Sequence, residues 1–479
     1  MFFNSLAYLI FLPIVFVAYW FLSFGSLRIQ NILLLIASYV FYAFWNWHFL
    51  FLLIFSTFLD YFTGLKIYQS NNLQRKRVWL AISVITNLGF LAVFKYYNFF
   101  VDSFAVMLRH VGFEPHYTTL QVILPVGISF YTFHGLSYVF DIYYDRFKPR
   151  TNVVDYSLFV SFFPLLVAGP IERATHLLPQ VETKRTFDYA KAVDGLRQIL
   201  WGLFKKMVIA DNCAEIANKI FNNTAPYNGS ALVVGALFFT VQIYGDFSGY
   251  SDIALGTARL FGIELLRNFA FPYFSRDIAE FWRRWHMSLT TWFRDYLYFP
   301  LGGSRGSKWQ QIRNTFIIFL VSGFWHGANW TFVAWGAFHA CCFLPLMLFK
   351  RNRHNLEIVA KGKLLPNYRE MLGMIVTFGL VVVGWVIFRC TTIKEAFHYI
   401  KGMFSRSLFQ FPNLNMPWYL VVLVVFFFIV EWCGREDDFA LRSLATSWPR
   451  LARWSFYYAM VFAIFYCTGS SQQFIYFQF

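Results

Sequence analysis

The sequence has few charged residues and no long polar stretch. Charged side chains make up 14% of the 479 residues, whereas soluble domains carry about 25%. Hydrophobic residues account for 58% of the chain and aromatic residues for 22%, and the mean hydropathy is +0.48. This composition excludes an ordinary soluble protein and predicts an all-α polytopic membrane protein. Because no block is polar enough to form a soluble domain, we expect one integral-membrane domain over residues 1–479.

Cysteine is scarce, and its spacing is uninformative. The six cysteines are Cys213, Cys341, Cys342, Cys390, Cys433 and Cys467. None of them forms a Cys-x-x-Cys pair or a zinc-ligand spacing, so we expect neither a disulfide framework nor a metal site. The formal net charge of +16 is gathered in a few loops. It therefore indicates membrane topology, and we do not expect a nucleic-acid partner.

Common catalytic motifs are also missing. The sequence contains no Walker loop, no His-Glu-x-x-His helix and no paired-carboxylate metal motif. One Gly-x-Ser-x-Gly match, at residues 302–306, lies in a basic loop without a preceding strand, and we interpret it as a turn. Histidine within apolar segments remains the main candidate catalyst. A neutral imidazole can take the proton of a hydroxyl while that hydroxyl attacks an activated acyl group.

Hydropathy predicts a series of membrane spans of about 20 residues each. They fall near residues 5–23, 30–47, 49–68, 78–99, 120–141, 196–217, 231–258, 312–330, 332–350, 370–388, 416–433 and 452–469. Basic clusters follow every second span, which places the N-terminus outside by the positive-inside rule. Residues 155–180 do not fit this alternation, because Pro164 and Gly169-Pro170 interrupt a short apolar run. We interpret that segment as re-entrant; a proline-kinked helix end is the alternative.

A basic and aromatic stretch begins at Arg276. Between Arg276 and Arg313 there are seven Lys or Arg residues and three Asp or Glu residues. On a continuous helical wheel, one apolar stripe is formed by Ile278, Phe281, Trp282, Trp285, Leu289, Trp292, Phe293 and Tyr296. Arg283 and Arg294 fall on the opposite face, and His286 lies at the edge of the stripe. We therefore predict an interfacial helix with its aromatic side chains in the acyl boundary and its arginines among phosphates.

His326 follows in the next apolar segment. Thirteen residues separate it from Arg313, which is roughly 20 Å of helix rise, whereas the hydrocarbon core is about 30 Å thick. We therefore expect this imidazole within the membrane, where an ionisable group suggests a function. The alternative is a buried histidine that only hydrogen-bonds a carbonyl. His134, in another glycine-broken span, is interpreted as a packing residue.

Acidic and hydroxyl side chains interrupt the span near 231–258. Asp246, Ser248, Ser251 and Asp252 occur within the sequence QIYGDFSGYSDIALG (242–256). Two acids there should face a polar interior instead of lipid. They either line a tunnel or are held by the arginines of the interfacial helix. A transporter or channel and an enzyme explain these residues about equally well.

At these motifs the chain resembles the membrane-bound O-acyltransferase family, in its bacterial branch of alginate O-acetyltransferase, PatA-like and DltB-like proteins. The matching stretches are LPVGISFYTF (124–133), FFPLLVAGPIER (162–173), YGDFSGYSDIALG (244–256), NFAFPYFSRDIAEFWRRWHMSL (268–289), FLVSGFWHGANWTFVAWG (319–336) and FIYFQF (474–479). The resemblance implies about eleven or twelve transmembrane helices with re-entrant and interfacial helices around a tunnel. It also implies an acyl donor on the cytoplasmic side and an acceptor outside.

The resemblance further implies roles for individual residues. The family's invariant histidine corresponds to His326, and a more variable polar position corresponds to His286; both are expected to be catalytic. Residues expected to bind substrate or donor are Trp325, Asn329, Asp246, Ser248, Asp252, Arg276, Trp282, Arg283 and Trp285. No cofactor or metal is expected.

The resemblance also implies partners. The donor would be acetyl-coenzyme A or an acylated carrier protein. The expected partners are the lipid bilayer of the cytoplasmic membrane, an exported polysaccharide and an extracytoplasmic SGNH-type acetyltransferase or esterase. Transfer of D-alanine to teichoic acid is one alternative, and a polytopic transporter or channel is another. An intramembrane desaturase is disfavoured, because His286, His326 and His339 are too dispersed to form its metal cluster.

Overall fold

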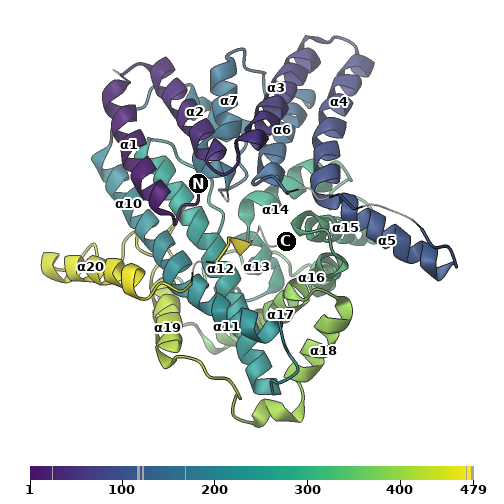
Figure 1. Ribbon diagram of the computed structural model, residues 1–479, viewed down its shortest axis with the longest axis vertical. Helices are drawn as coiled ribbons and strands as arrows, with labels where there is room; N and C mark the ends of the chain where they lie inside the picture. The colour runs from purple at the N-terminus through teal and green to yellow at the C-terminus, as the bar shows by residue number, and fades with distance from the viewer. Residues whose placement is uncertain (24, 116–118, 121–122, 168, 471, 476–479) are drawn as a thin grey trace. The chain divides into compact units, whose positions relative to one another are not determined.

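A computed structural model describes residues 1–23, 25–115, 119–120, 123–167, 169–470 and 472–475. The predicted span at 120–141 and the terminal FIYFQF motif lie partly outside these residues. Within them, all regular secondary structure is helical, and Figure 1 labels the helices. The all-α prediction is therefore confirmed. The chain divides into two compact units, residues 1–192 with 257–266 and residues 193–256 with 267–479. The prediction of a single domain stays a prediction.

The first unit contains the N-terminal helices. They are α1 (Leu6–Leu22), α2 (Leu27–Ala43), α3 (Trp47–Gln69), α4 (Leu73–Leu91), the π-helical turn η1 (Ala92–Tyr96), α5 (Tyr97–His110), α6 (Ile128–Tyr143), α7 (Val153–Ser161), α8 (Phe163–Leu166) and α9 (Ala174–Val181). Helices α3, α4 and α6 pack on one another, and α2 packs on α7.

Helices α10 (Tyr189–Leu203) and α12 (Gly229–Leu260) belong mainly to the second unit. Its other elements are the π-helical turn η2 (Phe204–Ala210), α11 (Asp211–Phe221), η3 (Pro272–Phe274), α13 (Ile278–Arg284), α14 (Met287–Phe293), the π-helical turn η4 (Arg294–Tyr298), α15 (Lys308–His326), α16 (Trp330–Leu348), α17 (Tyr368–Arg389), α18 (Ile393–Met403), η5 (Arg406–Phe409), α19 (Trp418–Cys433) and α20 (Arg450–Tyr466). Two of these helices have an N-terminal capping box. Ser307 is the N-cap of α15, and Asn367 is the N-cap of α17.

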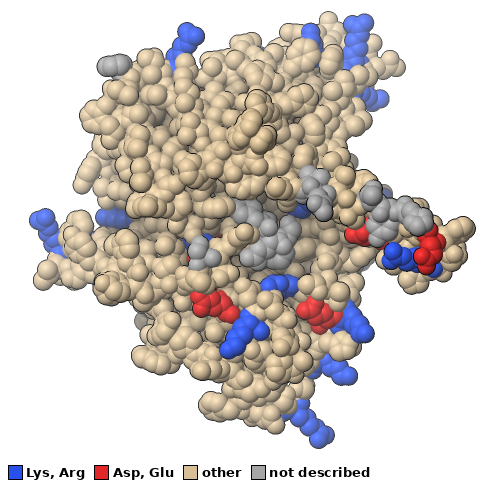
Figure 2. Space-filling view, viewed as in Figure 1, with Lys and Arg blue, Asp and Glu red and all other residues tan. Residues whose placement is uncertain are grey.

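Five helices are long and apolar enough to cross a membrane among the residues described. They are Trp47–Gln69, Leu73–His110, Gly229–Leu260, Trp330–Leu348 and Tyr368–Arg389. Three shorter apolar helices, α1, α2 and α19, lie near positions where spans are predicted. Large apolar side chains along α1 and α17 are exposed, and most of the surface visible in Figure 2 carries no charged side chain. The protein is therefore a multi-pass membrane protein. The five helices that are long and apolar enough among the residues described are fewer than the eleven or twelve transmembrane helices expected.

Residues 155–180 form short, buried and broken helices. Helix α7 ends at Ser161, α8 is a four-residue turn with Pro164 near its start, and α9 begins at Ala174. Most of their side chains are buried. None of these helices is long enough to span a bilayer. The predicted interruption at the proline positions is confirmed, while the re-entrant path through a membrane stays a prediction.

The predicted interfacial helix is wrong in two respects. It is not continuous, because α13 ends at Arg284 and α14 begins at Met287, with His286 in the left-handed region at φ 42°. Its aromatic stripe also does not face lipid, since Phe281, Trp282 and Trp285 are each at most 8% exposed inside the protein. A wheel drawn through the break therefore assigns the wrong directions to the side chains after residue 285.

Helices α15 and α16 lie side by side in close contact (Figure 1). Two glycines make this approach possible. A Cβ atom on Gly323 would lie 2.2 Å from the carbonyl oxygen of Phe332, and one on Gly336 would lie 2.2 Å from that of Phe319. Close helix packing through small residues is common within membranes. This contact fixes the end of α15, where His326 lies.

We predict that Gly336→Leu destabilises the protein, because the backbone of α15 leaves no space for a side chain. The cost should be at least about 1–3 kcal/mol, as for other overpacked cores. Thermal unfolding of the purified protein in detergent measures it. Gly379→Leu is the matched control, because a Cβ at that α17 glycine meets no atom within 4 Å. Equal melting temperatures for the two variants would contradict the packing account.

Candidate active site

His326 is the last residue of α15 and lies in an aromatic surround. Gly327, in extended conformation, ends the helix, and Asn329 caps α16 by accepting a hydrogen bond from the backbone N–H of Thr331. The imidazole is 4% exposed. Its ring centroid lies 5.0 Å from that of Trp325, 5.2 Å from Trp335 and 5.5 Å from Phe388. Asn329 is therefore a helix cap in this structure, and its predicted binding role stays a prediction.

The structure brings His286 close to His326. Their ring centroids are 6.4 Å apart in an edge-on arrangement, and Trp325 contacts both rings. The His286 side chain is 1% exposed, and the ring of Phe247 packs edge-on against it at 4.7 Å. The sequence places these two histidines forty residues apart, so their proximity is a result of the fold. The two residues predicted to be catalytic thus share one buried cluster.

Asn268 fixes the orientation of His286. The Asn268 Oδ1 atom lies 3.0 Å from His286 Nδ1 and also accepts a hydrogen bond from the Ser288 hydroxyl at 3.0 Å. An amide oxygen can only accept, so Nδ1 of His286 carries its proton and Nε2 carries the lone pair. Burial lowers the pKa of His286 to about 3, which keeps the ring neutral. The arrangement presents Nε2 as a hydrogen-bond acceptor.

The main chain also holds the break between α13 and α14. The backbone N–H of Met287 donates to the carbonyl of Asn268, and the N–H of Ala270 donates to the carbonyl of Arg284. These two bonds pair residues 268–270 with residues 284–287. Because they satisfy backbone groups that a continuous helix would otherwise use, the left-handed conformation of His286 is stabilised by tertiary contacts.

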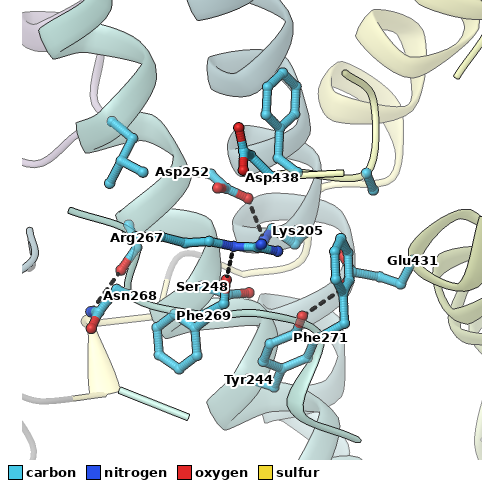
Figure 3. A pocket seen from close by; sticks show the side chains of 14 residues that line it. Lys205, Tyr244, Ser248, Asp252, Arg267, Asn268, Phe269, Phe271, Glu431 and Asp438 are labelled. Atoms are coloured by element: carbon cyan, nitrogen blue, oxygen red, sulfur yellow. Dashed lines mark hydrogen bonds and ion pairs between the residues drawn. The ribbon is translucent and has the colours of Figure 1, made fainter. Parts of the chain in front are cut away.

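A small polar cavity has Asn268, the hydrogen-bond partner of His286, in its wall. Figure 3 shows Lys205 facing Asp252 and Tyr244 facing Glu431 across it. The Lys205 ammonium lies 2.5 Å from the Asp252 carboxylate, and the Tyr244 hydroxyl donates to Glu431. Other residues in its wall are Ser248, Ser251, Arg267, Asn268 and Asp438. Since Asn268 Nδ2 donates to Ser251 and its Oδ1 bonds His286, the cavity wall and the histidine share one hydrogen-bonded network.

The size of this cavity limits what it can hold. The volume open to the centre of a water molecule is about 20 Å³, enough for about one water. The cavity can therefore hold about one water molecule beside Asn268, but it is too small for a thioester arm. Ser248 and Asp252 belong to its wall, as the interpretation of a polar lining predicts. A tunnel that connects the two sides of the membrane stays a prediction.

Asp246 has a different environment. Its carboxylate lies 2.8 Å from the Lys206 ammonium, which also lies 2.7 Å from Asp211. It additionally accepts a hydrogen bond from the backbone N–H of Ile475 near the C-terminus. The alternative in which interfacial arginines hold the acids of this span is wrong, because lysines of η2 hold both Asp246 and Asp252. Asp246 thus stabilises the packing of α12 against η2 and the C-terminal segment.

The predicted donor-binding arginines are engaged within the protein. Arg276 pairs with Glu280 at 3.0 Å and Glu370 at 3.2 Å. Arg283 donates to the carbonyls of Asn352 and Asn355, at 2.7 Å each. These bonds fix the loop between α16 and α17. Trp282 and Trp285 form part of the core beside His339, Trp335 and Trp385. In this structure the two arginines and the two tryptophans therefore make structural contacts within the protein.

Several polar residues of the cavity wall are absent from the sequence predictions. Lys205, Arg267, Asn268 and Glu431 lie at the cavity, with Glu431 2% exposed on α19 and Lys205 2% exposed in η2. The signal for Lys205 and Glu431 is the same as for His326, an ionisable residue inside an apolar segment. Asn268 carries no comparable signal, because an amide in a loop is ordinary. Within the described residues, no group of three or more His, Cys, Asp or Glu side chains could hold a metal ion.

Lys206→Met should strongly destabilise the protein. Removal of the ammonium leaves the carboxylates of Asp211 and Asp246 buried without their cation, a change that costs about 3–5 kcal/mol. Thermal unfolding in detergent measures the loss, with Lys219→Met at an exposed position as the control. Adding Asp211→Asn and Asp246→Asn should restore part of the stability. A Lys206→Met protein as stable as the control would disprove the ion-pair account.

Comparison with known proteins identifies related sequences. The sequence model of the membrane-bound O-acyltransferase family matches residues 144–383. A probable alginate O-acetylase, AlgI, of Pseudomonas aeruginosa is 42% identical over 417 residues, which cover 87% of this chain and 77% of that protein. A peptidoglycan O-acetyltransferase of Helicobacter pylori is 32% identical over 98% of this chain and 95% of its own length.

A more distant relative covers less of the chain. A teichoic acid D-alanyltransferase of Bacillus subtilis is 28% identical over 57% of this chain and 71% of its own length. The family match spans half of the chain and includes both His286 and His326. The extent of the match and the identity of the first two relatives lead to one conclusion: this chain belongs to the membrane-bound O-acyltransferase family and is an O-acyltransferase of the membrane.

Proposed function

We propose that this protein moves an acetyl group from a cytoplasmic thioester to a hydroxyl on the outer side of the cytoplasmic membrane. The final acceptor would be an exported polysaccharide, reached directly or through an extracytoplasmic SGNH-type transferase. The two relatives that cover 87% and 98% of this chain support this acceptor class, because their names specify alginate and peptidoglycan. D-alanyl transfer is less supported, since the corresponding relative covers 57% of the chain.

The observation that carries this proposal is the buried pair of His286 and His326. Both rings are inside the protein, and their centroids are 6.4 Å apart. This separation suits two side chains that act on one small acyl group. Asn268 presents Nε2 of His286 in its unprotonated form. The aromatic side chains around His326 exclude bulk water, which favours transfer over hydrolysis of the thioester.

His326 would act as the general base. As the acceptor oxygen attacks the thioester carbonyl carbon, its proton passes to the His326 imidazole. The C–S bond then breaks, the acyl C–O bond remains, and the proton moves from the imidazolium to the departing thiolate. His286 would assist, with its Nε2 lone pair accepting a hydrogen bond from a second donor, because the single hydroxyl proton goes to His326. The exchange of a thioester for an ester needs no nucleotide and no redox partner.

Donor binding would use the surface near Arg294, whose side chain is about half exposed and pairs with Asp295 at 2.8 Å. The predicted contributions of Arg276 and Arg283 would be indirect, because these residues hold the loop between α16 and α17. Acetyl-coenzyme A and an acylated carrier protein remain the two donor candidates. Trp325 would contact the acyl group, since its ring contacts those of both His286 and His326.

His326→Ala should lower acetylation of the exported polysaccharide by at least about 100-fold, the usual contribution of a positioned general base. Alkali-released acetate, measured in cells that carry this chain as their sole such enzyme, reports the activity. Immunoblots of membrane fractions check that the variant is present at the normal level. His398→Ala, at an exposed histidine, should retain full activity. Normal acetate release by His326→Ala would remove the general-base assignment.

Asn268→Ala should lower kcat by about 10-fold or more and leave the donor KM nearly unchanged. The reason is that no acceptor then holds the proton of His286 on Nδ1. Asn268→Asp keeps an oxygen that accepts from Nδ1 and should recover most of the activity. Initial rates with purified protein and a thioester donor separate the two constants. Equal loss in both variants would show that Asn268 has only a packing role.

A further inference from the structure

A second, larger pocket lies in the first unit, which does not contain the histidine pair. Its volume open to water is about 390 Å³. The wall is formed by the end of α1, the α9–α10 connection and the last turn of α12 with the loop that follows it, and it includes Trp20, Lys184, Arg185, Lys191 and Arg259. The family's catalytic residues are not part of it. The acyl transfer proposed above uses none of the residues in this wall.

Four basic side chains in this wall outnumber the acids near them. Arg259 and Lys191 share Glu264, at 3.0 and 3.6 Å. Arg185 is 6% exposed and donates to Asn31 and to two carbonyls, so it forms a fixed part of the wall. The wall therefore carries a net positive charge.

The acid in the wall and the remaining lysine differ in their contacts. Asp188, the one carboxylate in the wall, accepts hydrogen bonds from the backbone N–H groups of Ala190 and Lys191 at the start of α10. The Lys184 ammonium lies against the α1–α2 turn at Gly25. Among the residues described, it has no carboxylate partner within ion-pair distance.

The pocket lies where an apolar helix ends. Helix α1 exposes Ile10, Ile14, Val17 and Phe21, each by more than half, as a lipid-facing helix does. Trp20, near its end, donates its indole N–H to the carbonyl of Leu260 and forms part of the pocket wall. Tryptophan is enriched at the membrane–water interface. These features favour a position of the basic pocket at headgroup level, beside a surface that can contact acyl chains.

We propose that this pocket binds the phosphate of an anionic phospholipid. The phosphate oxygens of the lipid would accept hydrogen bonds from the Lys184 ammonium, with Lys191 and Arg259 nearby. The acyl chains of the lipid would lie along the exposed face of α1. The chemistry recognised is a phosphate ester, which soluble glycerol phosphate also offers. The apolar face of α1 favours the lipid, because a soluble anion gains nothing from it. The topology predicted from the basic loops puts the end of α1 on the cytoplasmic side, where anionic headgroups attract lysines.

Native mass spectrometry of the full-length protein tests the proposal. The protein is released from nanodiscs that contain phosphatidylcholine with or without phosphatidylglycerol, and the retained lipids are counted. The wild type should retain phosphatidylglycerol selectively. The double variant Lys184→Gln with Lys191→Gln should bind it about 30-fold more weakly, as expected for the loss of two lysines near a membrane surface. Lys184→Arg with Lys191→Arg should bind like the wild type.

The matched control removes two exposed charges elsewhere in the same unit. Arg75→Gln with Arg77→Gln lowers the net charge equally but leaves the pocket intact, and it should retain the lipid. Equal retention by the Lys184 and Lys191 double variant would overturn the site. Lipid-free protein titrated with glycerol phosphate provides the second arm. If glycerol phosphate binds as tightly as phosphatidylglycerol, the lipid assignment is overturned. If glycerol phosphate binds at least 10-fold more weakly, the lipid assignment is supported.

Discussion

The hydrogen bond between His286 and Asn268 determines what the rest of the site can do. It joins two chain segments eighteen residues apart and fixes the imidazole with its proton on Nδ1. The backbone bonds between residues 268–270 and 284–287 hold the same pair of segments together. Because His286 is in the left-handed region, its side chain points away from the direction that a continuous α13–α14 helix would give it. The break thus strains the backbone at His286 and places the Nε2 acceptor of this residue near His326.

Around this bond the protein supplies a rigid, mostly apolar frame. The rings of Trp325, Trp335 and Phe388 surround His326, and two glycines bring α15 against α16 so that the end of α15 is fixed. Several charged groups near this frame form ion pairs. Lysines of η2 neutralise the acids of α12, and Glu280 neutralises Arg276 and Arg284. If the donor is the proposed thioester, this division between an apolar histidine site and paired charges would protect it from water.

Much of this arrangement is predictable from the sequence. Hydropathy gives α12, α15, α16 and α17 within a few residues of their observed ends. The functional role that the sequence assigns to His326 stays a prediction. The break at His286 is not predictable, because the local sequence favours a continuous amphipathic helix and a tertiary hydrogen bond from Asn268 overrides it. The lysine partners of Asp246 and Asp252 are missed for a similar reason, since they come from another predicted span and pairing depends on packing. Asn268 itself has no local signal.

The protonation state of His286 tests the account most directly. Solid-state NMR of the membrane-embedded protein with nitrogen-15-labelled histidine distinguishes a protonated from an unprotonated ring nitrogen, and a His286→Asn sample identifies the resonances of His286. The account predicts a neutral ring with its proton on Nδ1 and a bare Nε2 at neutral pH. A charged ring, or a neutral ring with its proton on Nε2, would contradict it.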